Sequence, residues 1–325
     1  MIVDLTDTTA AAIGAALVQA RHSAGVPAVG MVMTLVIVSD EATSYDALRA
    51  ALDAAREHPS RILLTILRRG RAVARLDAEV RFLGDSGPGE TVVMRLHGEL
   101  ADHAESVLVP LLLPDAPVVV WWPGSDSPEE PAKDPVGALA QRRITDSAAA
   151  DDPHSELQRR SRGYQPGDTD LAWTRVTQWR SLLAAALDQP VAPITGGLVA
   201  CEPGSPSAEL LASWLSLRLG VEITQETSAG PGITGVRLDC GDASIEVSRP
   251  DGRVAHLLRP GQPERQVSLQ RRETAEIIAE ELRRLDPDEM YGEVVGRLTG
   301  RVEAEPVRPG QPDEASGVSG AATSQ

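Results

Sequence analysis

The sequence predicts an α/β protein that has a mixed sheet with flanking helices in its first domain and a smaller α/β second domain. Apolar runs of strand length alternate with amphipathic helical segments in the first half. Two alternating segments joined by glycine-rich residues indicate an antiparallel edge. Residues 107–124 combine an apolar helix end, a proline-rich turn and a β-branched run ending in Trp121 and Trp122. They predict a buried strand at the centre of the first sheet.

The first domain is expected to span residues 1–167. Its helices are predicted from apolar residues at helical spacing, and its buried strands from continuous apolar runs. One helix ends near His58, because a residue before proline disfavours helical angles. The expected elements are a helix at 8–21, a strand at 30–38, a helix at 40–56, a strand at 61–67, a hairpin of 73–82 and 91–97, a helix at 101–112, the central strand, a helix at 135–141, a strand at 143–147 and a helix at 155–162.

The second domain is expected to span residues 168–300. A disordered tail should follow at 301–325, where Pro, Gly, Ser, Ala and Glu dominate. Asp170 is a candidate N-cap, and Ser205 with Pro206 supplies a cap and a first helical position further on. The expected elements are a helix at 170–187, a strand at 194–202, a helix at 207–219, short antiparallel strands at 237–239, 244–248 and 255–259, and helices at 273–285 and 288–298.

Composition narrows the classes of function. The 325 residues carry a net charge of −16, and Lys133 is the only lysine among 31 basic residues. A nucleic-acid-binding protein needs a clustered basic face, and anionic membranes also attract basic segments, so the acidic balance disfavours both partners. Neither a signal peptide nor a membrane-spanning run is predicted, and two cysteines are too few for a disulfide framework. A cytoplasmic location is therefore expected.

Motifs for catalysis and for metal binding are weak. The histidines show no metal-ligand spacing, so neither a metal nor a cofactor is predicted. The residues at 84–87 match four letters of a serine-protease nucleophile motif, but their place between two alternating segments favours a hairpin turn. The junction at Ser205 and Ser207 presents free backbone N–H groups at a helix start. A sugar phosphate could bind there, and a simple capped helix is the alternative.

Two tryptophans and two arginines are candidates for contact with a partner protein. Trp173 and Trp179 fall on the predicted core stripe of the 170–187 helix, which also carries Arg175 and Arg180. Stripe tryptophans usually pack in a core, yet Trp and Arg are also the types most enriched at interface hot spots. A buried arginine needs a counterion, so both arginines should meet either a partner or a carboxylate from the first domain.

Two further places are candidates for the same role. Trp121 and Trp122 stand at the end of the central strand, where open α/β sheets place their sites. His58 and Arg61 flank the joint between a helix end and a strand start. That joint forms either a rigid turn or a surface that meets a partner or an anion.

Five segments carry a resemblance to a known family, namely TLVIVSDE at 34–41, REHPSRI at 56–62, LLLPDAPVVVWWPG at 111–124, DLAWTRVTQWR at 170–180 and ASWLSLRLG at 212–220. On these segments the sequence resembles the glucose-6-phosphate dehydrogenase assembly protein family, OpcA. The resemblance implies a noncatalytic protein that binds glucose-6-phosphate dehydrogenase and promotes its active oligomer or raises its substrate affinity. It implies no catalytic residues. A sugar-phosphate-binding enzyme or effector sensor that uses residues 205–208 stays as the alternative.

Overall fold

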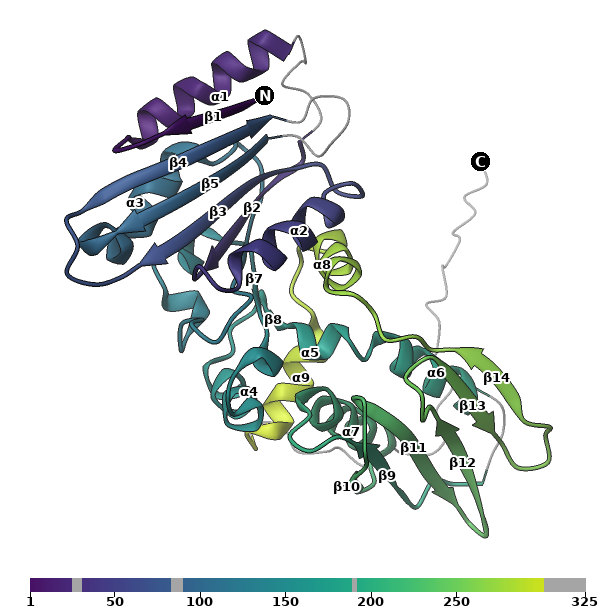
Figure 1. The fold of residues 1–325 in the computed structure, drawn as a ribbon. Helices are drawn as coiled ribbons and strands as arrows, with labels where there is room; N and C mark the ends of the chain where they lie inside the picture. The colour runs from purple at the N-terminus through teal and green to yellow at the C-terminus, as the bar shows by residue number, and fades with distance from the viewer. Residues whose placement is uncertain (25–30, 83–89, 189–191, 301–325) are drawn as a thin grey trace, which may run out of the picture.

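A computed structural model of the chain describes residues 1–24, 31–82, 90–188 and 192–300. In these residues the predicted fold class is confirmed, because two sheets are flanked by helices (Figure 1). None of the described helices has the length and the hydropathy that crossing a bilayer requires. The tail expected at 301–325 and the turn expected at 84–87 lie outside the described residues.

The first sheet contains eight strands among the described residues, in the order β1-β4-β5-β3-β2-β6-β7-β8. The β1–β4 and β4–β5 pairs are antiparallel, as the hairpin signal predicts, and the pairs from β5 to β8 are parallel. β6 is an interior strand and fully buried, although the middle of the sheet lies at β3 and β2. The strands are β1 (Ile2–Leu5), β2 (Met33–Ser39), β3 (Ser60–Arg68), β4 (Arg75–Phe82), β5 (Glu90–His97), β6 (Val118–Trp121), β7 (Arg142–Thr145) and β8 (Asp168–Asp170).

Helices cover both faces of the first sheet, which explains why its central strands are apolar on both sides. One core lies between the sheet and the neighbouring helices α2 and α8, and a second core lies under α1 and α3 on the opposite face (Figure 1). Successive residues of a strand point to opposite faces, so Trp121 belongs to the first core and Trp122 to the second. The helices are α1 (Ala10–Ala24), α2 (Ser44–Ala54), α3 (Ala104–Leu108) and α8 (Thr274–Arg283).

The second sheet has six strands in the described part of the chain, in the order β10-β9-β11-β12-β13-β14. Only the β10–β9 pair is parallel. Buried residues of α6, α7 and α9 join those of the strands in a third core. The elements are α4 (Pro153–Gly163), α5 (Leu171–Thr174), α6 (Thr177–Leu187), β9 (Gly196–Cys201), α7 (Pro206–Leu219), β10 (Ile223–Thr227), β11 (Ile233–Cys240), β12 (Ala243–Ser248), β13 (Val254–Leu258), β14 (Arg265–Ser268) and α9 (Glu289–Leu298).

The region near residue 168 connects the two sheets closely. β8 begins at the predicted start of the second domain, yet it pairs with β7 and completes the first sheet. Near the end of the chain, α8 returns to the first sheet and packs beside α2 (Figure 1). A buried ion pair of 2.6 Å between Arg142 on β7 and Glu281 on α8 also joins α8 to the first sheet. The division into domains at 167 and 168 stays a prediction.

Three predicted helices differ in extent from the observed ones. The helix expected at 101–112 is an α-helix only at α3, between the 3₁₀ turns η2 (Gly98–His103) and η3 (Val109–Leu111). Pro110 explains this, since it has no amide hydrogen and restricts the residue before it. The helix expected at 170–187 is divided into α5 and α6 at Val176, whose φ of −96° and ψ of 5° leave the helical region. The helix expected at 135–141 is only a 3₁₀ turn, η5 (Gly137–Leu139).

Four short strands were not predicted from the sequence. β1 and β14 are edge strands with largely exposed residues, and β10 is exposed at every position except its first. β8 is only three residues long and has the sequence Asp-Thr-Asp. Segments of three to five residues are too short to show a clear pattern, and hydrogen bonds to a neighbouring strand hold them in place.

Candidate binding pocket at the start of α7

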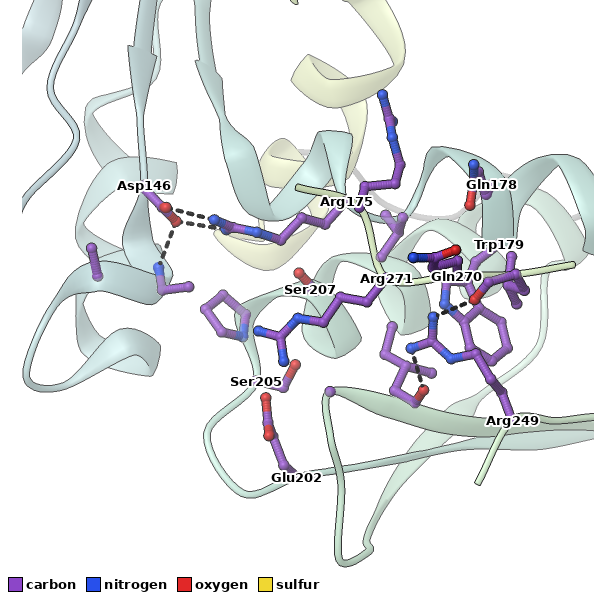
Figure 2. Close-up of a pocket in the computed structure, with 18 residues that line it drawn as sticks. Asp146, Arg175, Gln178, Trp179, Glu202, Ser205, Ser207, Arg249, Gln270 and Arg271 are labelled. Atoms are coloured by element: carbon purple, nitrogen blue, oxygen red, sulfur yellow. Dashed lines mark hydrogen bonds and ion pairs between the residues drawn. The ribbon is translucent and has the colours of Figure 1, made fainter. Parts of the chain in front are cut away.

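A pocket of about 230 Å³ lies beside the N-terminus of α7 (Figure 2). Its walls come from the 3₁₀ turn η6 (Ser147–Ala149), the α5–α6 turn, the β9–α7 junction and the segment after β14. Drug-sized ligands occupy sites of roughly 300–1,000 Å³, so this pocket suits a small molecule. The charged residues that line it are Asp146, Arg175, Glu202, Arg249, Arg271 and Arg272.

The start of α7 has the capping chemistry that the sequence predicts. Ser205 is the N-cap, its Oγ accepts the amide of Ala208 at 3.4 Å, and Pro206 takes the first helical position. The hydroxyl of Ser207 donates to the carbonyl of Ala172 at 3.0 Å and so links α7 to α5. The first amides of a helix have no intrahelical acceptor, and the helix dipole makes this end positive. Pro206 has no amide hydrogen and the amide of Ala208 is already capped, so the amide of Ser207 and the positive end of the helix dipole are what this wall offers an anion.

Arg249 is a buried cation on the facing wall. It is 5% exposed, and it donates from Nη1 to the carbonyl of Leu269 at 2.9 Å and from Nη2 to that of Ile233 at 2.8 Å. Its Nε has no hydrogen-bond partner, and no carboxylate in the described residues pairs with its guanidinium. Burial lowers the pKa of Arg249, and the positive charge of Arg271 lowers it further. A buried guanidinium without a counterion would gain from an anionic ligand.

The other arginines of the pocket differ in their partners. Arg175 is held by Asp146 through two hydrogen bonds of 2.7 and 2.6 Å, so the expected carboxylate from the first domain is present. Arg272 pairs with Glu280, which lies outside the pocket lining. Figure 2 shows Arg271 extending from the segment after β14 toward Ser205. Within the described ranges, no carboxylate pairs with the exposed side chain of Arg271.

Arg180, the second arginine predicted to face a partner, lies outside this pocket. Its guanidinium stacks on the ring of Trp173 at 3.6 Å from the centroid, and its Nη2 donates to the hydroxyl of Thr177 at 3.1 Å. It lines a different depression, between α6, α8 and α9, together with Glu280 and Asp288. Partial exposure beside these carboxylates leaves Arg180 accessible to a partner.

The four tryptophans that were candidates for partner contact are buried. Their exposed fractions are 1% for Trp121, 3% for Trp122, 1% for Trp173 and 2% for Trp179. The indole Nε1 of Trp173 donates to Asp288 at 2.8 Å, so even its polar atom is used inside the chain. These rings pack in the cores of this conformation, and a direct contact with a partner stays a prediction.

Arg61 is buried in this conformation and pairs with a carboxylate of the first sheet. It is 7% exposed, donates to Glu90 at 2.8 and 2.5 Å, and donates to the carbonyl of Leu111 at 2.7 Å. Glu90 is 1% exposed and also pairs with Arg21 at 2.6 Å. A buried carboxylate needs such cations, which explains why Arg61 points inward. His58 is half-buried, and the partner contact predicted for this pair is untested.

The sequence predicted functional residues on one wall of the pocket but none on the facing wall. Ser205, Ser207, Arg175 and Trp179 were all identified, and they line the same pocket. Arg249 was missed, because a charged residue directly after a strand normally faces solvent. Its burial depends on pairing within the second sheet. Among the described residues, no group of three or more His, Cys, Asp or Glu side chains is arranged to hold a metal ion.

Comparison with known families accounts for both halves of the chain. Residues 51–162 match the family described as the glucose-6-phosphate dehydrogenase subunit N-terminal domain, and residues 166–295 match the C-terminal domain of that subunit. The chain belongs to the OpcA family. Most residues of the pocket lie in the part of this OpcA-family chain that matches the C-terminal domain.

Curated relatives support the same family over a shorter stretch. The OxPP cycle protein OpcA of Synechococcus elongatus is 30% identical over 118 residues, which cover 34% of this chain and 26% of that protein. The protein of the same description from Nostoc punctiforme is 30% identical over 117 residues, which cover 34% of this chain and 25% of that protein. The match thus spans about a quarter of the length of these relatives.

Among solved structures, the matches have low similarity and include a ketoreductase and a dehydrogenase. The 3-ketoreductase KijD10 of Actinomadura kijaniata is 12% identical, with a TM-score of 0.46 over 82% of this chain and 95% of its own. UDP-N-acetylglucosamine 3-dehydrogenase GnnA of Acidithiobacillus ferrooxidans is 13% identical, with a TM-score of 0.39 over 84% of this chain and 99% of its own.

Proposed function

We propose that this chain is a noncatalytic assembly factor and allosteric activator that binds glucose-6-phosphate dehydrogenase in the cytoplasm. It would promote the active oligomer of that enzyme in the oxidative pentose phosphate pathway. The observation that carries the proposal is the pair of family matches to the two domains of a glucose-6-phosphate dehydrogenase subunit. The relatives described as OxPP cycle proteins support the same pathway.

Activation without chemistry requires differential binding. A ligand shifts an equilibrium only if it binds one conformation or oligomer more tightly than the others. The chain must therefore prefer the form of the dehydrogenase that binds substrate well. Coupling of this kind is reciprocal, so substrate should tighten the complex by the same factor by which the chain raises substrate affinity.

The experiment measures the native mass and the kinetics of the dehydrogenase with and without this chain. We expect a larger complex and a higher substrate affinity or turnover at saturation. Titrations of the chain with and without glucose 6-phosphate would test the reciprocal effect. An unchanged dehydrogenase at saturating chain, or turnover of a metabolite by the chain alone, would contradict the proposal.

We expect Arg180→Ala to weaken this association. Truncating an arginine at an interface hot spot costs about 2 kcal/mol, which corresponds to roughly a 30-fold higher dissociation constant. Arg175 is kept in this variant, because its removal would leave Asp146 without its counterion. The control is Arg265→Ala, which removes an exposed arginine from edge strand β14. Equal affinity of both variants, measured by titration of folded proteins, would remove Arg180 from the contact surface.

A further inference from the structure

We propose that the pocket at the start of α7 binds a small phosphate monoester that also carries hydroxyl groups. The inference concerns the chain alone and does not depend on the proposed partner. The argument uses the charge of the pocket, the buried Arg249 and the position of Glu202.

The charge of the pocket is opposite to that of the chain. The chain carries a net charge of −16, yet four arginines and only two carboxylates line this pocket. Asp146 is already neutralised by Arg175 at 2.6 Å, and Arg272 is neutralised by Glu280 outside the lining. Arg249 and Arg271 remain as cations without a carboxylate among the described residues. An anion that enters would meet a positive site inside a protein whose surface repels anions.

The donors of the pocket suit a phosphate group. The amide end of α7 and the guanidinium groups of Arg249 and Arg271 approach the cavity from different walls (Figure 2). A phosphate monoester has several acceptor oxygens and a charge near −2, so it can bond a helix N-terminus and arginines at once. Arg249 adds a second, independent positive group, because it is 5% exposed, its Nη1 and Nη2 donate only to main-chain carbonyls, and no carboxylate among the described residues forms an ion pair with it.

Glu202 explains why the ligand should carry hydroxyl groups. Its side chain lines the pocket next to Ser205 (Figure 2), and a carboxylate there would repel bare phosphate. A carboxylate accepts hydrogen bonds from hydroxyl groups, so Glu202 suits the polyol part of a phosphorylated compound. The ring of Trp179 is buried under the guanidinium of Arg249, which lies 5.0 Å from its centroid, so Trp179 supports Arg249 at this wall of the cavity. Together these residues should favour a phosphorylated polyol over inorganic phosphate.

The test is calorimetric titration of the full chain at low ionic strength with glucose 6-phosphate, inorganic phosphate and glucose. We expect glucose 6-phosphate to bind more tightly than phosphate, and glucose not to bind. Arg271→Ala should weaken glucose 6-phosphate binding about tenfold or more, since a charge-assisted hydrogen bond is lost. Arg271 is exposed, so this variant should fold. Glu202→Gln should reduce the preference for the ester over inorganic phosphate.

The matched control is Arg265→Ala, which removes the same charge from a position outside the pocket and should leave both affinities unchanged. Absence of glucose 6-phosphate binding would overturn the proposal. An equal affinity of Arg271→Ala and the unchanged chain would overturn it too. Equal affinities for glucose 6-phosphate and inorganic phosphate in the unchanged chain would overturn the assignment of a hydroxylated ligand.

Discussion

Replacing Glu281 with alanine is expected to destabilise the protein by roughly 3–5 kcal/mol, because it leaves a buried arginine without its counterion. Arg142 and Glu281 have side chains that are each 5% exposed, and two hydrogen bonds of 2.6 and 3.1 Å join them. Glu281 also accepts the hydroxyl of Thr174. One side chain thus connects β7, α5 and α8. The free energy of unfolding in urea would measure the loss.

The neighbouring residue on α8 provides the control. Glu280 pairs with Arg272, but its side chain is 27% exposed, and partly exposed pairs contribute about 0–1 kcal/mol. Glu280→Ala should therefore have a much smaller effect than Glu281→Ala. The double variant Arg142→Met/Glu281→Leu should regain most of the lost stability, since apolar pairs can replace buried ion pairs. If Glu281→Ala lowered the free energy of unfolding no more than Glu280→Ala, the buried Arg142–Glu281 pair would not be a main stabilising contact between β7 and α8.

The core of the first sheet could be predicted because its sequence signals are local. β2, β3 and β6 are continuous apolar runs, and a run of this kind has few alternatives to a strand buried on both faces. The start of α7 was equally readable, since Ser205 and Pro206 combine a cap with a favoured first residue. The strands β1 and β8 could not be found in this way, because their positions depend on pairing with β4 and β7.

The role of the tryptophans and arginines was ambiguous in the sequence for a physical reason. A large ring at a core position of a helix and a large ring at an interface give the same spacing. Trp173 and Trp179 are buried in the third core of this conformation, and their contact with a partner stays a prediction. Only part of the pocket lining could be predicted, because Arg249 and Arg271 come from separate segments of the second sheet region. Their proximity follows from strand pairing, which the local pattern does not contain.

Asp170 should make the stability of the protein depend on pH between about 4 and 6. Its carboxylate is fully buried and accepts hydrogen bonds from the amide and the hydroxyl of Ser147, from the amide of Ala172 and from the hydroxyl of Thr145. Burial, and then the negative charge of Asp146, raise the pKa of Asp170 to about 6. When Asp170 is protonated, its hydrogen has an acceptor in the hydroxyl of Thr145. That hydroxyl can then donate to the carbonyl of Thr169 instead.

The direction of the effect follows from the two pKa values. In the unfolded chain an aspartate titrates near 3.9, so between that pH and about 6 the folded state binds more protons. The contribution of Asp170 to the free energy of unfolding is therefore greatest below about pH 4, falls as the pH rises from about 4 to about 6, and is largely lost above 6. A shift of about two pKa units corresponds to roughly 3 kcal/mol.

Asp170→Asn isolates this contribution, because asparagine does not titrate. The variant should be less stable than the unchanged protein by about 1–3 kcal/mol near pH 4, since its amide nitrogen faces donors that a carboxylate accepts. The deficit should shrink as the pH rises to 7, where the unchanged protein carries a buried charge. Asp251→Asn, at a carboxylate that accepts two amide hydrogen bonds in an exposed turn, should show no such narrowing. A deficit for Asp170→Asn that stays constant or widens from pH 4 to 7 would mean that Asp170 keeps an ordinary or lowered pKa, with its four hydrogen bonds outweighing burial.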